Sequence, residues 1–326
     1  MSATLVREPP QPGMFDKART LGACAVAVEV FLTVGWVAMA PDDPLGAVSL
    51  LSRGAPAAMF VQVLALALLA AGAGTLIAGR LLPDIGTLAA CVGLGAVSLR
   101  GATAESLLVD AVGPAGSGFG WLGVKLLLEA AAWVLLAFGA TLFSAIIARW
   151  CHTPSASLPG DDENADARVR SAAMDFPYFS RRWFGVANEA PMDRRIGWMH
   201  AGVVGAATLV LTMVFIEGFD ARATQHGQTC FVVAAAVAIG SYFGHRFCPV
   251  RSAAWTLVGV WAACIACYLF GAVAPAHEGL PITLSWNPML RILPIQFVAC
   301  GTASAVFMFW NMAGEPEERS AYGGGL

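Results

Sequence analysis

Three ionisable side chains lie inside long apolar segments, where a charge is costly. Glu29 lies about nine residues into the first apolar segment, roughly 13 Å deep at about 1.5 Å per residue. Lys125 and Glu129 are spaced i, i+4 and therefore share one helix face. A carboxylate near the bilayer midplane costs about 2.5–3.5 kcal/mol on insertion scales, so we expect it to face other helices. The three residues predict a site that handles protons or small cations, with a hydrogen-bonded structural role as the alternative.

The two carboxylates are expected at a similar depth, because their segments enter the membrane from opposite sides. If those two segments touch, Glu29 and Glu129 share a polar cavity. Lys125 is the weaker candidate, since its long stem allows the ammonium group to reach the headgroups.

Histidine and cysteine pairs at span ends offer a possible metal site. Cys151-His152 and His245-x-x-Cys248 fall at the same predicted side and together form a two-Cys, two-His set. Adjacent residues rarely both ligate one ion because their side chains diverge. We therefore expect these residues to be ordinary interface residues and the protein to bind no metal.

Haem and thiol redox chemistry are also weakly indicated. His200 and His245 are the histidine pair whose depth suits two axial haem ligands. Cys264 and Cys267 have Cys-x-x-Cys spacing in the middle of a span, away from the helix ends and positive charges that activate thiols. We expect no cofactor. The sequence also lacks Walker A, His-Glu-x-x-His and Gly-x-Ser-x-Gly motifs, which disfavours the enzyme classes that they mark.

The composition requires that these residues be positioned by membrane helices. The chain is 57% hydrophobic and 13% charged, against about 25% charged for a soluble domain. No Lys/Arg cluster is large enough to indicate nucleic acid binding. Segments of roughly 20 apolar residues predict an all-α polytopic membrane protein with about eight transmembrane helices in a lipid bilayer. The expected spans are 20–40, 56–79, 83–100, 121–148, 196–217, 229–247, 252–274 and 290–313, of which 83–100 is the least regular.

The distribution of basic residues predicts the orientation. With the N-terminus inside, 14 Lys/Arg residues fall on the cytoplasmic side and 4 on the other, with Lys125 inside a span. We therefore expect a multi-pass protein of a bacterial-type inner membrane with both termini in the cytoplasm. The first apolar run ends in Ala38-Met39-Ala40, which imitates a signal-peptidase site. At about 20 residues it exceeds the ~7–15 of a signal sequence, so we expect it to be retained.

A polar loop, 149–195, divides the chain into two four-span halves, 1–148 and 196–326. Its second part mixes aromatic and basic residues, a composition typical of a segment lying in the headgroup layer or binding a soluble partner. The residues concerned are Phe176, Tyr178, Arg181, Arg182 and Trp183.

A faint repeat relates the two halves at an offset of 166 residues. Arg80 and Pro83 match Arg246 and Pro249, and Lys125 matches Arg291. A duplicated four-span unit keeps its orientation, so the repeat predicts a pseudo-twofold axis along the membrane normal.

Three functions remain open. The first is a proton-coupled transporter of a small solute or ion that uses the buried carboxylates. The second is a non-catalytic subunit of a larger membrane complex, a quinone-handling anchor or an assembly factor, with the 149–195 loop as its contact. The third is a membrane enzyme acting on a lipid or isoprenoid, with Arg181, Arg182, His152 and His245 near a headgroup.

Overall fold

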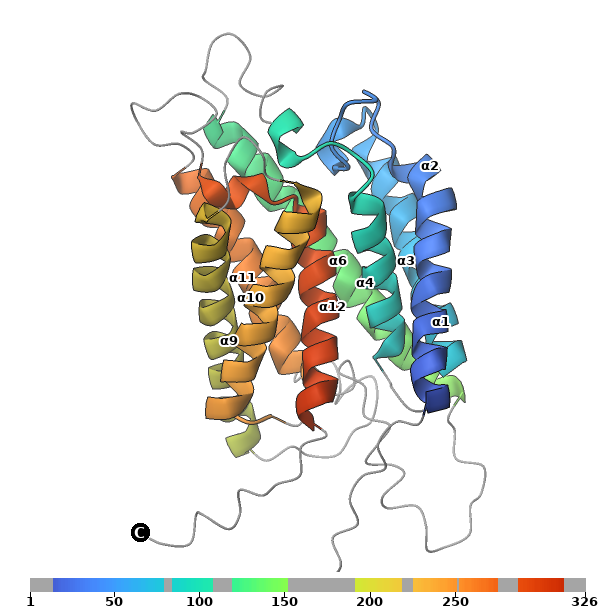
Figure 1. The fold of residues 1–326 in the computed structure, drawn as a ribbon, viewed down its shortest axis with the longest axis vertical. Helices are drawn as coiled ribbons and strands as arrows, with labels where there is room; N and C mark the ends of the chain where they lie inside the picture. Colours follow the sequence, from blue (N-terminus) through green and yellow to red (C-terminus); the bar gives the residue numbers. More distant parts are fainter. Residues whose placement is uncertain are drawn as a thin grey trace, which may run out of the picture.

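The computed structural model describes residues 14–78, 84–107, 119–151, 191–218, 225–250, 252–274 and 287–313. These residues form a helical bundle (Figure 1), and the one β-bridge among them joins Ala47 to Ala102. The longer helices are α1 (Met14–Val30), α3 (Pro56–Ala78), α4 (Ile85–Ser98), α6 (Phe119–Cys151), α9 (Pro191–Glu217), α10 (His226–Phe247), α11 (Ala253–Val273) and α12 (Pro294–Ala313).

The helices confirm an all-α polytopic membrane protein. Seven helical stretches in the described ranges are long and apolar enough to cross a bilayer, the first of them being Lys17–Met39. The remaining expected span, 83–100, is the apolar helix α4, which has 14 residues. At about 1.5 Å per residue it measures roughly 21 Å, short of the ~30 Å hydrocarbon core.

Polar residues bound this short helix at its two ends. Asp84, 3% exposed, immediately precedes α4. Arg100 follows it and donates a 2.7 Å hydrogen bond to the carbonyl of Leu32, and its guanidinium lies 4.4 Å from the centre of the Trp36 ring. The apolar run is therefore bounded by a buried acid before α4 and by an exposed arginine after it, which binds the first span.

The first span contains a π-helical turn, η1 (Phe31–Gly35), between α1 and α2 (Trp36–Met39). A π-turn disturbs the regular ladder of backbone hydrogen bonds, and Arg100 binds one carbonyl of this turn. Phe31 is fully buried against Gly93 of α4, where any added Cβ would overlap the phenyl ring. The turn thus fixes α1 against α4.

The helices pair similarly in the two halves of the chain, except that α3 packs extensively on α4 whereas the corresponding helices α10 and α11 barely touch. In the first half α1 packs on α3 and α4, and α6 packs on α3 and α4. In the second half α9 packs on α10 and α11, and α12 packs on α10 and α11. The halves meet through α4 with α12, α6 with α11 and α6 with α12, contacts that a twofold exchange of the halves preserves. This pattern agrees with the repeat at 166 residues, although the duplication itself stays a prediction.

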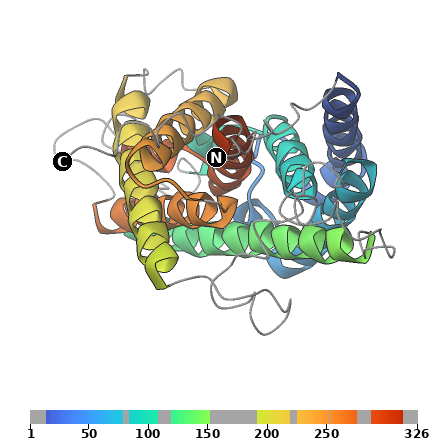
Figure 2. The ribbon, with the colours of Figure 1, turned by 90° about the horizontal axis from the view of Figure 1, so that it is seen from below.

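The longest helix, α6, runs obliquely across the width of the molecule beside both groups of helices (Figure 2). Its 33 residues measure about 50 Å, so a tilt accommodates the excess over the bilayer thickness. Close packing against the second half occurs at Gly123, where an added Cβ would lie 2.6 Å from the Cα of Ala272. The start of α1 and the end of α12 lie at the same end of the bundle, called here the lower end (Figure 1).

Candidate functional site

The segment 40–55 at the opposite, upper end folds back into the top of the first half. It connects α2 to α3, and its residues Ala47, Val48, Ser49 and Leu50 are almost fully buried. Polar backbone at this depth is tolerated when protein surrounds it and satisfies its hydrogen bonds. We refer to residues 40–55 as the upper loop.

Glu129 anchors the lowest part of the upper loop. Its carboxyl accepts hydrogen bonds from the Ser49 hydroxyl, from the Leu50 N–H at 3.1 Å and from the Trp133 indole N–H at 2.9 Å. The side chain is 3% exposed. Three donors from two elements therefore compensate for the burial of this carboxyl. The sequence predicted a buried, interior Glu129, and the structure gives it these partners.

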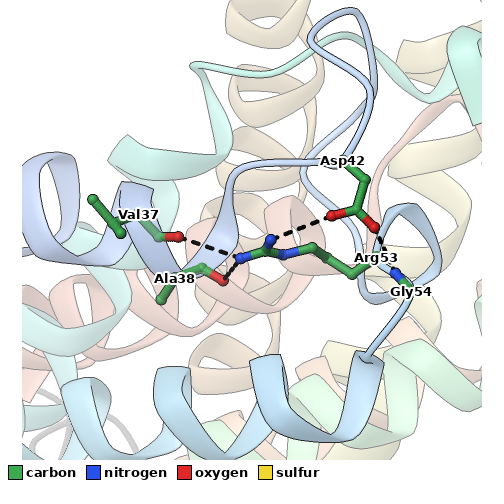
Figure 3. A network of polar contacts seen from close by, with 5 residues as sticks. All are labelled: Val37, Ala38, Asp42, Arg53 and Gly54. Carbon is green, nitrogen blue, oxygen red and sulfur yellow. Dashed lines mark hydrogen bonds and ion pairs between the residues drawn. The ribbon is translucent and has the colours of Figure 1, made fainter.

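A second network holds the outer part of the upper loop (Figure 3). The Arg53 guanidinium binds the carbonyl oxygens of Val37 and Ala38 at 3.3 and 2.8 Å and pairs with Asp42 at 3.3 Å. The Gly54 N–H donates to the other Asp42 oxygen at 2.7 Å. The hydrogen bond from the Gly54 N–H lowers the pKa of Asp42 below its usual value, and the hydrogen bond from Arg53 lowers it further.

Residues of this second network line a pocket of about 520 Å³ at the upper end, between the loop and the start of α6. Asp42, Asp43 and Arg53 line it from the loop, and Lys125 lines it from α6. Both signs of charge therefore converge on one cavity, whose volume is in the range of small-molecule sites, ~300–1,000 Å³. Sequence reasoning missed the loop residues. The signal was the acidic pair in Pro41-Asp-Asp-Pro44, with Arg53 eleven residues after Asp42.

Lys125 and Glu129 both lie on the helix α6 but have different surroundings. Glu129 turns inward to the loop, whereas Lys125 is exposed at the pocket, with its ammonium nitrogen 5.9 Å from the centre of the Trp121 ring. A spacing of four residues is offset by about 40° around a helix, which is enough to separate the buried side from the pocket.

Glu29 does not join this site. Its side chain is exposed on the outer face of α1, so the expectation that it faces the bundle interior is wrong. The expected cavity shared by Glu29 and Glu129 is also absent, because the Glu129 carboxyl binds the upper loop. The physical reason is that α1 packs on α3 and α4 with its other face.

His200 and His245 lie side by side at the lower end, with ring centres 5.1 Å apart. The fully buried His200 donates from Nδ1 to the carbonyl of Cys248 at 2.8 Å and accepts at Nε2 from the Thr256 hydroxyl at 2.9 Å. Rings in direct contact leave no space for a porphyrin between them, and both His200 nitrogens already have partners. The pair therefore does not fit axial haem ligation and instead ties α9 to α10 and α11.

The remaining weak candidates form no metal group within the described residues. No three His, Cys, Asp or Glu side chains lie together there in a way that could hold an ion. Cys264 and Cys267 are buried in α11 as free thiols. His152 lies outside the described residues, as do the predicted surface residues Phe176, Tyr178, Arg181, Arg182 and Trp183. The side chain of Cys151 is likewise outside them.

A further polar cluster at the upper end joins the halves. The His226 ring donates from Nε2 to the Gly101 carbonyl at 2.7 Å and accepts at Nδ1 from the Gln296 amide at 2.7 Å. Gln296 in turn accepts from the Thr229 hydroxyl at 2.9 Å. These contacts satisfy the neutral ring and connect α10 and α12 to the segment after α4, so we assign the cluster a structural role.

Comparisons with known proteins find no match to this chain among family models, curated proteins or solved structures. The structure's coarse class, a multi-span membrane protein, therefore rests on the helices alone.

Proposed function

We propose that this protein is a membrane transporter that captures a small zwitterionic solute in the pocket at its upper end. The observation that carries the proposal is the convergence of Asp42, Asp43, Arg53 and Lys125 on one cavity of about 520 Å³. Asp42 and Arg53 already bind each other, and their pair builds the wall. Lys125 is then the cation for a solute carboxylate, and Asp43 is the anion for a solute ammonium group.

Glu129 is the candidate for proton coupling beneath this pocket. Its Oε1 atom accepts hydrogen bonds from two N–H groups, those of Leu50 and Trp133, and these groups can only donate. Its Oε2 atom faces the Ser49 hydroxyl, which can rotate and accept a hydrogen bond. The carboxyl can therefore take up a proton at Oε2 and keep its partners. A change at Ser49 passes directly to the loop that walls the pocket.

The predicted orientation of the protein in the membrane determines the side from which solute would enter the pocket. The excess of Lys/Arg supports a bacterial-type inner membrane with both termini in the cytoplasm, which makes the upper end external. The pocket would then receive solute from outside. The 149–195 loop, on which the subunit alternative rests, lies largely outside the described residues, as do three of the four residues on which the lipid-enzyme alternative rests.

The test is direct binding of a panel of amino acids and betaines to the purified protein, measured by calorimetry. Lys125→Met should weaken binding of a zwitterion at least tenfold, and Asp43→Asn should weaken it for solutes with an ammonium group. Lys17→Met, the same change at an exposed lysine of the lower end, is the matched control and should leave binding unchanged. Equal effects of the two lysine variants, or no binding by any zwitterion, would overturn the proposal.

Coupling is tested separately in proteoliposomes. With a bound solute identified, uptake driven by a pH gradient should be lost in Glu129→Gln, while exchange of solute without a gradient should remain. Loss of both activities would contradict a role in proton coupling and would leave Glu129 as a structural anchor.

A further inference from the structure

The outer face of the first span carries an ionisable group, Glu29, in the middle of the membrane, and no partner for it lies in the part of the chain that the structure describes. Glu29 lies 12 residues after Lys17 and 10 before Met39, the bounds of the span, so about 15–18 Å separate it from each end. Its carboxyl has no hydrogen bond or ion pair among the described residues. The helices packed against α1 do not supply one, because α3 has no charged side chain and α4 has none between its ends.

Small side chains extend the exposed face around this carboxyl. Ala18, Gly22, Ala25 and Thr33 recur with Glu29 at spacings of three and four residues, and all are exposed. A Cβ added at Gly22 would meet nothing within 4 Å. Of the seven full-length spans this one is the least covered by the rest of the protein. In its apolar stretch of 18 residues 22% of the residues are buried, against 33–56% in the other spans. Figure 2 shows α1 at the edge of the bundle, on the side away from α9.

We propose that this face of α1 binds α1 of a second copy of the chain in a parallel twofold dimer. Lipid tails cannot hydrogen-bond a carboxyl, whereas small residues allow two helix backbones to approach closely and polar residues then bond across the contact. Two copies have the same orientation in a membrane, so their axis lies along the membrane normal and each residue meets its equivalent at the same depth. Glu29 therefore meets the Glu29 of the partner, and the O–H of one carboxyl donates a hydrogen bond to an oxygen of the other.

The second half contains a matched face for comparison. The helix α9 occupies the position that corresponds to α1 in the pattern of helix contacts. Its Gly202 is exposed and has nothing within 4 Å of an added Cβ, as at Gly22. The exposed face around Gly202 carries the larger side chains Trp198, Met199 and Val210. Among the described side chains of α9 the exposed carboxylate is Glu217, which lies at the end of the helix and not in its middle. The α1 face therefore differs from the α9 face in two respects, the carboxyl in mid-span and the small side chains next to it, and Gly202 serves as a control position outside the proposed contact.

The experiment measures dimerisation of the fluorescently labelled full chain by single-molecule photobleaching in vesicles of phosphatidylethanolamine and phosphatidylglycerol, over a range of protein-to-lipid ratios. Glu29→Leu should weaken the dimer roughly 5- to 30-fold, the value of one interhelical polar contact, whereas Glu29→Gln, which can still pair with itself, should stay near wild type. Gly22→Leu should abolish close approach and weaken the dimer at least as much. Gly202→Leu should have no effect.

A chain that stays monomeric at all ratios would overturn the proposal and direct attention to a different membrane protein as the partner of α1. A dimer that resists the α1 variants, or that responds to Gly202→Leu, would place the contact on another face and equally refute it. Because none of these residues lines the upper pocket, the dimer and the solute site can fail independently.

Discussion

Two replacements of Glu129, by leucine and by glutamine, test whether hydrogen-bond acceptance by this side chain holds the upper loop in place. In Glu129→Leu two fixed donors, the Leu50 N–H and the Trp133 indole N–H, lose their acceptor inside the bundle. A buried donor left without a partner costs about 1–3 kcal/mol, so the two together cost about 2–6 kcal/mol. The Ser49 hydroxyl adds less, because it can rotate to another acceptor.

Glu129→Gln is the matched variant. Its amide oxygen can accept from both N–H groups, and its amide nitrogen can donate to the reversed Ser49 hydroxyl, so we expect a loss of at most about 1 kcal/mol. The free energy of unfolding is measured for both variants by titration with a denaturing detergent in mixed micelles. Ser49→Ala should cost less in the Glu129→Leu background than in the wild type, since the two side chains share one contact.

Equal stability of the leucine variant and the wild type would falsify this account of the upper loop, since it would mean that the three donors do not depend on the carboxyl. Equal and large losses in both variants would instead show that charge, rather than hydrogen-bond acceptance, holds the loop. The difference between leucine and glutamine therefore decides between the two physical causes.

Three further predictions follow from the networks around this loop and from the contact between the halves. The pKa of Asp42 is lower in the folded protein than its unfolded value of about 3.8, so the ionised carboxylate stabilises the fold above that pH. This stabilisation is lost as the pH falls through the lower folded pKa. The melting temperature of the wild type should therefore exceed that of Asp42→Asn at pH 7, and the two should converge as the pH falls below ~4. Arg100→Met should lower the free energy of unfolding by about 1–3 kcal/mol in the same mixed micelles, because it removes a charged hydrogen bond to the π-turn together with a cation–π contact, and an unchanged value would contradict that role. Gly123→Ala should destabilise the contact of α6 with α11 by about 1–3 kcal/mol through overpacking, whereas Gly202→Ala, at an open position, should be neutral in the same titration.

Helix number and placement were predictable because each span needs a long apolar run, a property of the segment alone. The sequence located the longer helices to within about six residues at each end, and it identified 83–100 as the least regular span, but it did not predict the short helix at Leu50–Ser52. The partners of Glu129 were not predictable, because Ser49 and Leu50 lie about 80 residues away in the chain. Nothing local marks the upper loop as a segment that returns into the bundle.

The contrast between Glu29 and Glu129 shows where such prediction fails. In a soluble helix the buried face is apolar and the exposed face polar, so periodicity identifies the inward side. In a membrane helix both faces are apolar, and the rule that a charged residue faces inward takes the place of periodicity. That rule holds for Glu129 and fails for Glu29 within one chain. The rule follows from the cost of exposing a charge to lipid, so it concerns the surface of the complete assembly and not of one chain. The exposed Glu29 is therefore best explained if the surface of α1 is an interior surface of a dimer, and the photobleaching experiment tests that explanation directly.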